Sequence, residues 1–200
     1  WMAAFLDKEP EHKKEKAIGI AKSLGFKTEP LNINTSGKVW EISDDGKTLI
    51  QPLTSIKGLG DSAMDQILMN RPFNTIEEFL FHKEVTYSKL NKKALDVLCR
   101  SGAMKSLQDD RFTGAKHFWS CVAVDRPRKE ANLLDNIETY ADEGDFSTEE
   151  RIQYLTDLTG MFPINLVMKG DTLSQLVDNG IPAISEYDKK LQMVWFIPRK

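Results

Sequence analysis

Apolar residues recur at helical spacing in the first part of the chain. Within residues 11–25 the apolar positions are Ala17, Ile20 or Ala21, and Leu24. Lysines occupy most of the other face, so the pattern predicts an amphipathic helix. Gly25 follows the last apolar position, where a glycine in the left-handed conformation commonly ends a helix.

Two short segments of alternating apolar and polar residues follow, at 39–42 and 47–50. Residues 43–46 between them, Ser-Asp-Asp-Gly, carry a turn signal, so we predict a small β-hairpin here. Asp44 and Asp45 are adjacent carboxylates that resemble a metal site. Their position favours a role in the turn instead, because Asp side chains accept hydrogen bonds from nearby backbone amides.

The next part of the chain indicates short helices and a less regular stretch. Residues 53–105 combine helical spacing with tight turns that contain glycine. Residues 108–147 show mixed spacing with an acidic run at their end, and we expect a linker or irregular region there. Ser147 provides an N-cap for a helix that continues to about Leu158.

Two further elements are predicted near the end of the sequence. Residues 171–179 have the pattern of a short helix, followed by Gly180 and Pro182. Residues 191–197 have the pattern of a strand. A single strand is not stable alone, so we expect the chain to stop inside a further β domain.

Residues 53–67, LTSIKGLGDSAMDQI, hold the most specific motif. Its apolar residues and glycines are Leu53, Ile56, Gly58, Leu59, Gly60, Ala63 and Ile67. Their order predicts two helices joined by a tight hairpin, in which Gly58 and Gly60 allow positive φ and a close backbone approach. Leu59 fills the gap between the two helices. The pattern resembles the helix-hairpin-helix motif of DNA-binding proteins that do not read sequence.

This motif predicts a binding site for a phosphate. The free amides of the turn and of the second helix, which Asp61 or Ser62 caps, can hold an anion. Such backbone contacts carry no base information, so we expect duplex binding without sequence preference. The alternatives are an ordinary turn between helices and a solvated lysine face. The predicted phosphate-binding residues are Lys57, Gly58, Leu59, Gly60 and Ser62 at the hairpin, with Lys89, Lys92 and Lys93 ahead of the second helical pair.

Charge is unevenly distributed along the 200 residues, whose formal net charge is −3. Residues 131–160 contain eight acidic residues and one arginine, so this stretch carries −7 and the rest of the chain carries +4. The overall acidity argues against DNA binding driven by charge alone. It is compatible with local contacts to the DNA backbone, because the lysines near the hairpin lie outside the acidic stretch.

Other candidate chemistry is sparse. Cys99 and Cys121 make neither a disulfide framework nor a four-ligand zinc site, and they indicate a reducing cytoplasm. His12, His82 and His117 are far apart in the sequence, so we expect surface or boundary positions for them. No run of roughly 18 apolar residues is present, so we expect no membrane partner. An independent small enzyme is disfavoured, because the sequence contains no catalytic constellation.

Four separate stretches, in order, resemble the alpha subunit of bacterial DNA polymerase III, the replicative polymerase of the C family. They are residues 1–6, residues 24–26 with 29–36, the hairpin motif itself, and residues 72–73, 76–79 and 90–104. Their order and spacing make the match specific over about residues 1–107. The divergence of the remaining chain suits a phage-encoded or accessory polymerase.

The resemblance implies a mainly α fold with a tandem helix-hairpin-helix module, one small β-hairpin and the start of an OB-like β domain. In the family, the catalytic carboxylates and their Mg²⁺ ions lie in the palm, upstream of the segment that matches Trp1. We therefore expect no catalytic residue, metal ligand or cofactor here, although the implied parent is a DNA-directed DNA polymerase, a nucleotidyltransferase. The implied divisions are 1–50 for the end of the fingers with the β-hairpin, 51–107 for the tandem module, 108–147 for an acidic connector, 148–180 for a helical connector and 181–200 for the OB-like start.

The resemblance also implies partners and a location. Double-stranded primer-template DNA is the expected partner, with other replisome subunits, in the bacterial cytoplasm at the nucleoid or during phage infection. The family's clamp-binding motif, a Gln followed closely by Leu-Phe, is not found in residues 108–150, so we expect no direct sliding-clamp contact. The alternative is a structural or protein-protein interaction module of the replisome. The interaction-module alternative is favoured if the four lysines do not lie on one face with the hairpin amides. These lysines are Lys57, Lys89, Lys92 and Lys93.

Overall fold

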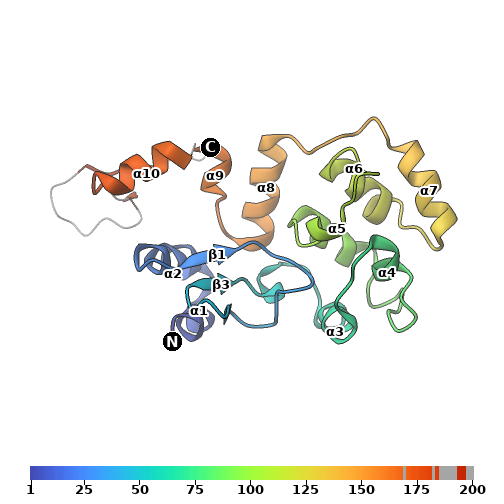
Figure 1. Ribbon diagram of the computed structural model, residues 1–200, viewed down its shortest axis with the longest axis horizontal. Helices are drawn as coiled ribbons and strands as arrows, with labels where there is room; N and C mark the ends of the chain where they lie inside the picture. Colours follow the sequence, from blue (N-terminus) through green and yellow to red (C-terminus); the bar gives the residue numbers. More distant parts are fainter. Residues whose placement is uncertain (169, 182, 185–192, 197–200) are drawn as a thin grey trace.

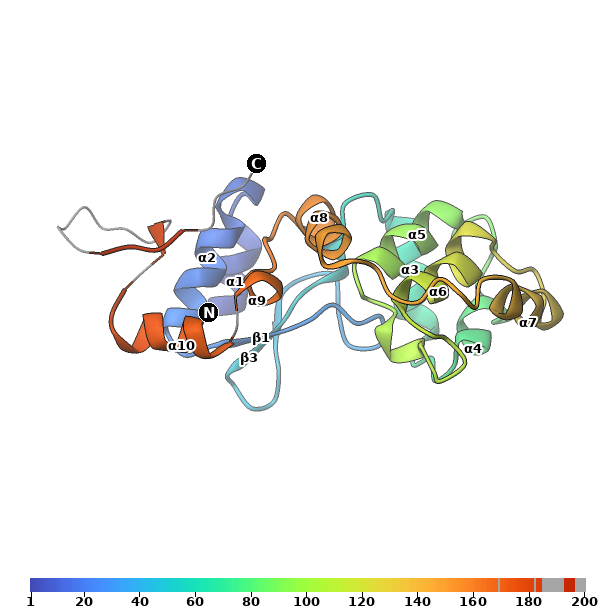
Figure 2. The same cartoon turned by 90° about the horizontal axis from the view of Figure 1, so that it is seen from above.

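The computed structural model describes residues 1–168, 170–181, 183–184 and 193–196, and short helices make up most of it (Figure 1). A small sheet and two helices lie at one end, and a cluster of helices lies at the other. Helix α8 (Thr148–Thr159) runs between the two groups in both views (Figure 1 and Figure 2). The structure confirms the mainly helical fold class that the sequence predicts.

The smaller apolar core lies between α1 (Met2–Lys8), α2 (Glu11–Ser23) and the sheet. Helix α2 confirms the predicted amphipathic helix, and Gly25 follows it with φ +86°. Ala17 and Ala21 of the predicted apolar face are buried, whereas Ile20, the stated alternative to Ala21, and Leu24 are exposed. Leu24 lies beyond the last helical residue and so leaves the apolar stripe. The buried residues of α2 are Ala17, Ile18 and Ala21.

Strands β2 (Glu41–Ile42) and β3 (Thr48–Ile50) form the predicted antiparallel hairpin. The Asp45 carboxylate holds the turn by accepting hydrogen bonds from the hydroxyl of Ser43, from a second hydroxyl and from two backbone amides. These bonds, that from Ser43 first among them, hold the pKa of Asp45 well below its usual range. Strand β1 (Lys27–Glu29) pairs in parallel with β3 and was not predicted, because its Lys-Thr-Glu sequence has no apolar alternation.

The larger core confirms the predicted series of short helices after the hairpin. These elements are η1 (Leu53–Ser55), α3 (Asp61–Asn70), α4 (Ile76–Leu80), α5 (Lys92–Arg100) and η2 (Lys105–Leu107). The first helix of the predicted motif is reduced to the single turn η1. Phe73 and Phe79 are fully buried and meet edge to face, with ring centroids 5.0 Å apart.

Residues 108–147 are helical and packed, so the linker or irregular region expected there is wrong. They form α6 (Ala115–Trp119), the π-helical turn η3 (Ser120–Val124) and α7 (Glu130–Thr139). Helix α5 contacts α6 and η3, and η3 contacts α7. The π-helical turn interrupts the spacing of 3.6 residues per turn, which hides the apolar face from a pattern analysis. The division of the chain into domains itself stays a prediction.

His117 is fully buried, whereas the sequence led us to expect a surface or boundary position. Its two ring nitrogens lie 3.0 Å from the backbone nitrogen of Thr113 and 3.0 Å from the carbonyl oxygen of Ile137. A buried polar ring needs such partners. Because Ile137 comes from α7, 20 residues further along the chain, the local sequence around His117 does not reveal it.

Helix α8 begins with a capping box that confirms the predicted cap. The Ser147 hydroxyl accepts a hydrogen bond from the backbone amide of Glu150, whose carboxylate accepts one from the amide of Ser147. Gly160 ends the helix with φ +70°. Helices α9 (Ile164–Val167) and α10 (Gly170–Asp178) follow, and α10 agrees with the helix predicted at 171–179.

The predicted start of an OB-like domain is not confirmed. Ala183 and Trp195 form an isolated parallel bridge. Pro182 and most of the strand predicted at 191–197 lie outside the described residues. Within the described part of the chain, no helix has both the length and the apolar character needed to cross a membrane.

Two adjacent leucines of α7 test whether the acidic segment belongs to the core. Leu133 is 1% exposed, whereas Leu134 is 55% exposed. We expect Leu133→Ala to lower the free energy of unfolding by roughly 2–5 kcal/mol, because it leaves a cavity in the core. The matched change Leu134→Ala should alter it by about 0.5 kcal/mol or less. Urea unfolding followed by circular dichroism measures both, and equal effects would contradict the packing of α7.

Candidate nucleic-acid interface

The hairpin turn places its two glycines in different conformations. Gly58 has φ +88°, which explains why a residue without a Cβ is needed there. Gly60 has φ −77° and serves as the N-cap of α3, so the positive φ that we expected for it is wrong. Neither Asp61 nor Ser62 caps the helix, because α3 begins at Asp61 and has no side-chain cap. The helix therefore begins with uncapped backbone amides.

Four amides around this turn are open. Among the described residues, the backbone N–H groups of Gly58, Gly60, Asp61 and Ser62 have no hydrogen-bond acceptor, and all four residues are exposed. The amide of Leu59 donates to Ile56 instead, with an N···O distance of 3.2 Å. The open set therefore contains the two predicted glycines and the first two residues of α3. Unpaired amides at a helix start are suited to binding an anion.

The Leu59 side chain faces the other way, into the larger core, where it is 7% exposed. It belongs to the same cluster as Leu53 and Ala63, so η1, the turn and the start of α3 pack together. The tip of the turn is anchored from outside as well, because the amide of Lys57 donates to the carbonyl of Leu158 at 2.8 Å. The hairpin is thus held between its own core and the end of α8.

Two of the predicted lysines lie at the hairpin. A methyl group at Gly58 would lie 3.7 Å from Cε of Lys93, so the first turn of α5 passes directly beside the turn. A methyl group at Gly160 would lie 3.7 Å from Nζ of Lys57, which places that ammonium near the C-terminal end of α8. A helix C-terminus attracts a positive charge, so Lys57 has a structural neighbour in addition to its predicted role.

In the described part of the chain, no hydrogen bond or ion pair brings the other two lysines to the hairpin. Lys92 donates from Nζ to the carbonyl oxygen of Val124 at 2.8 Å, which turns it toward the end of η3. Lys89 is exposed in the loop before α5. The structure therefore brings Lys93 to the turn, places the Lys57 ammonium near Gly160 at the end of α8, and directs Lys92 toward a neighbouring part of the surface.

Two arginines on that neighbouring surface are not among the residues that the sequence analysis identifies. Arg126 and Arg128 flank Pro127, and both guanidinium groups lie over the ring of Tyr87, at 3.7 and 5.5 Å from its centroid. The only signal in the sequence is two basic residues on either side of a proline after an apolar run. The ring that positions them comes from a distant loop, so their grouping is visible in the fold alone.

Of the acidic stretch, Asp157 lies near the hairpin, because it directly precedes Leu158. Glu149 and Glu150 lie in the first turn of α8, at the opposite end of that helix from Leu158. Burial raises the pKa of both Cys99 and Cys121, the latter to about 12, so both are inert neutral thiols. Within the described residues, no group of three or more His, Cys, Asp or Glu side chains could hold a metal ion.

Residues 25–114 match the family model described as the helix-hairpin-helix motif. This match covers the sheet, the open turn and helices α3 to α5, so it assigns the region around the hairpin to a known class of module. The chain contains this motif, as the pattern of residues 53–67 predicts.

The chain is also similar to curated proteins named DNA polymerase III subunit alpha. It is 30% identical to that of Xylella fastidiosa over 118 residues, which are 56% of this chain and 10% of the relative. The subunits of Pseudomonas aeruginosa and Thermotoga maritima are each 30% identical over 99 and 95 residues, 48% of this chain and 8% and 11% of the relatives. These matches confirm the resemblance to the alpha subunit, although the chain spans only about a tenth of the length of these relatives.

The two glycines of the turn should respond differently to alanine. Gly58→Ala is expected to lower the free energy of unfolding by about 1–2 kcal/mol, because the left-handed region penalises a Cβ. Its methyl group would meet Val97 at 3.6 Å without a clash, so the cost arises in the backbone.

Gly60→Ala is the matched control, because its φ is ordinary and no atom lies within 4 Å of the added methyl group. Its weaker N-cap and its less flexible unfolded state should offset each other to within about 0.5 kcal/mol. Thermal or urea unfolding measures both variants. A larger loss for Gly60→Ala than for Gly58→Ala would contradict this geometry.

Proposed function

We propose that the hairpin grips the backbone of duplex DNA without reading its sequence, as part of a replicative DNA polymerase. The observation that carries the proposal is the set of four exposed amides without acceptors, at Gly58, Gly60, Asp61 and Ser62. They surround a turn that has no Cβ at its two glycines, so a phosphate can approach the backbone closely. Phosphate oxygens are acceptors only, which matches a site made of donors.

The nearby charges support this ligand. Lys93 lies beside Gly58, and the ammonium of Lys57, the residue before Gly58, lies near Gly160 at the end of α8. Neither lysine takes part in an ion pair of the described part of the chain. Each can therefore pair with a phosphate without first breaking a salt bridge. Contacts of this kind position a duplex but carry no base information.

Such a grip would add affinity and processivity to a polymerase without entering its chemical step. The resemblance to the alpha subunit supports primer-template DNA as the duplex, with the catalytic carboxylates and their Mg²⁺ in other parts of the parent protein. In this proposal residues 1–50 are the end of the fingers and residues 51–107 carry the tandem module. The regions 108–147 and 148–180 then connect it toward an OB-like domain that starts in 181–200.

One observation favours a second candidate function. The ammonium of Lys92 is bound by the carbonyl of Val124 and is not displayed beside the hairpin amides. The four lysines therefore do not form a single cluster, which suits a structural or protein-protein interaction module within the replisome. Binding to DNA distinguishes the two candidates directly.

Binding of the chain to a fluorescent duplex of about 20 base pairs should weaken steeply with salt. If the hairpin and its lysines neutralise a few phosphates, the slope of log affinity against log salt should be roughly −2 to −4. Two duplexes of unrelated sequence should bind equally well, as fluorescence anisotropy would show. No binding at low salt, or binding that does not change with salt, would favour the interaction module.

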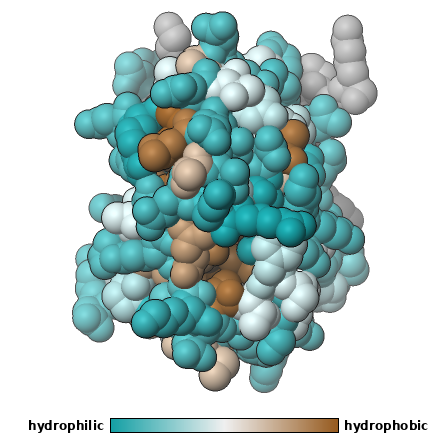
Figure 3. Space-filling view, turned by 90° about the vertical axis from the view of Figure 1, so that its right-hand side faces the viewer, coloured by the Kyte–Doolittle hydropathy of each residue, from teal (hydrophilic) through white to brown (hydrophobic). Residues whose placement is uncertain are grey.

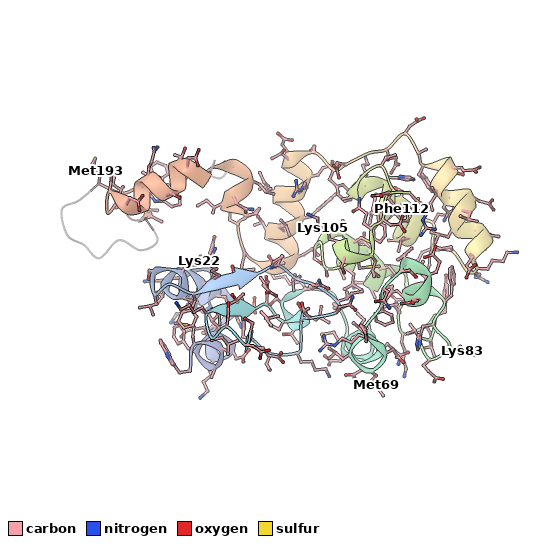
Figure 4. All side chains as sticks on the ribbon, viewed as in Figure 1. Lys22, Met69, Lys83, Lys105, Phe112 and Met193 are labelled. Carbon is pink, nitrogen blue, oxygen red and sulfur yellow. The ribbon has the colours of Figure 1, made fainter. Side chains whose placement is uncertain are left out.

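Substitutions at the hairpin should separate phosphate binding from folding. Lys93→Gln is expected to reduce the salt slope by about 1, and Gly60→Val to weaken binding by obstructing the backbone, with the helical circular dichroism unchanged. Lys57→Glu combined with Gly60→Val should abolish binding. Lys22→Gln is the matched control, because Lys22 is exposed at the other end of the molecule from α3 (Figure 4). An equal loss for Lys22→Gln and Lys93→Gln would contradict a localised grip.

A further inference from the structure

A hollow of about 500 Å³ lies away from the hairpin turn, between the loop after α4 and the segment that follows η3. Leu80, Phe81 and Val85 contribute apolar lining, and Arg126 and Arg128 contribute positive charge. Figure 3 faces this end of the molecule and shows apolar side chains set back between hydrophilic ones. Lys83 lies on the same loop (Figure 4) and lines a neighbouring hollow.

Arg126 is the unusual residue of this hollow, because it is a charged side chain that is only 6% exposed. Its guanidinium lies 3.7 Å from the ring centroid of Tyr87, and its Nη1 donates to the Tyr87 carbonyl at 2.9 Å. Its Nε is buried without a hydrogen-bond partner. None of the ion pairs in the described part of the chain includes Arg126.

The charge of Arg126 is therefore held in the protein without a counter-ion. Burial lowers its pKa, but a guanidinium remains protonated in proteins. Contact with the Tyr87 ring attracts the cation and fixes its plane, yet a ring supplies no negative charge. A buried charge that lacks an anionic partner is costly unless such a partner arrives from outside. Arg128 is exposed beside it, so a second guanidinium is available to the same incoming group.

We propose that this hollow binds a phosphate of the same DNA whose backbone lies at the hairpin, a proposal that rests on the proposed function. Guanidinium groups recognise phosphate oxygens through paired N–H donors, and two of them on one ring make a fixed receptor for such a group. The phosphate would supply the counter-ion that Arg126 lacks.

Basic residues connect the hollow with the hairpin, and this continuity favours a nucleic-acid strand over a single acidic side chain. Val124, which binds the ammonium of Lys92, is two residues from Arg126. Lys92 is followed at once by Lys93, which lies beside Gly58. Lys92 and Lys93 therefore lie between the hollow and the open amides, with the exposed carboxylate of Asp125 as the one acidic residue between Val124 and Arg126.

Acidic residues limit the direction in which the strand can leave the hollow. A second hollow, which shares Phe81 and His82 with the first, is lined by four acidic residues and one lysine. Its net charge is negative even with Glu77 paired to Arg111. The charged residues are Glu77, Glu78, Lys83, Glu84 and Glu130. Phosphates would be repelled there. The strand is therefore directed toward α5 and the hairpin, and not past α4.

The experiment compares Arg126→Met and Arg128→Gln with the matched control Arg151→Met in the full chain. Arg151 is exposed on α8 and takes part in none of the ion pairs of the described residues. Fluorescence anisotropy is measured with a blunt duplex, a duplex with a single-stranded overhang, and a single strand. Each of the two test variants should weaken binding roughly 10-fold and reduce the salt slope by about 1, whereas Arg151→Met should leave both unchanged. If Arg126→Met does not fold, Arg128→Gln alone decides, because Arg128 is exposed.

The three DNA substrates and the variants together distinguish the possible results. A loss of binding to the blunt duplex assigns the phosphate to a paired strand. A loss confined to the overhang or the single strand assigns it to an unpaired one. Either result supports the proposal.

If Lys93→Gln weakens binding and the arginine variants do not, the hollow is not a phosphate site, and the proposed function stands. If the arginine variants weaken binding and Lys93→Gln does not, the hollow binds DNA and the hairpin function fails. Binding of hexaglutamate in place of DNA, lost in Arg126→Met, would assign the hollow to an acidic peptide and overturn the proposal.

Discussion

Helix α5 packs an apolar face against segments that lie on both sides of it in the sequence, and the arrangement of the hairpin depends on this contact. The helix contacts α6, η3 and α8, and its Val97 lies where a methyl group at Gly58 would touch it. Burying one face of α5 therefore positions the turn, the π-helical segment and α8 together. The buried residues of α5 are Ala94, Leu95, Val97, Leu98 and Cys99. Because Lys92 and Lys93 open the same helix, that packing also decides where the basic surface lies.

The distribution of charge follows from the same packing. The net charge of −3 is the sum of −7 in residues 131–160 and +4 in the rest of the chain. The acidic residues of that stretch lie in α7, in α8 and in the loop between them. The turn that carries the open amides is attached to the other end of α8, where the backbone amide of Lys57 donates to the carbonyl of Leu158. Separation along one helix keeps the carboxylates of Glu149 and Glu150 away from the donors. An acidic chain can therefore present a local, donor-rich surface suited to a phosphate.

Local patterns predicted those features whose cause is local. The turn after β2, the capping box at Ser147 and the glycine turn near residue 58 each depend on residues a few positions apart, and the structure confirms them. The helices at 108–147 were missed because a π-helical turn disturbs their spacing and because their partners lie in α5. The buried position of His117 was missed for a similar reason, since the carbonyl of Ile137 that contacts its ring comes from α7.

The sequence alone determined that the chain carries a helix-hairpin-helix motif and resembles the polymerase III alpha subunit, because glycine spacing and the order of short motifs are properties of the linear chain. The tertiary structure decided which amides stay open, since the Leu59 amide finds an acceptor and those of Gly58 and Gly60 do not. It also decided that Lys93 joins the turn and that Arg126 is buried over Tyr87. These outcomes depend on contacts between distant segments, and a pattern of neighbouring residues does not contain the distances between them.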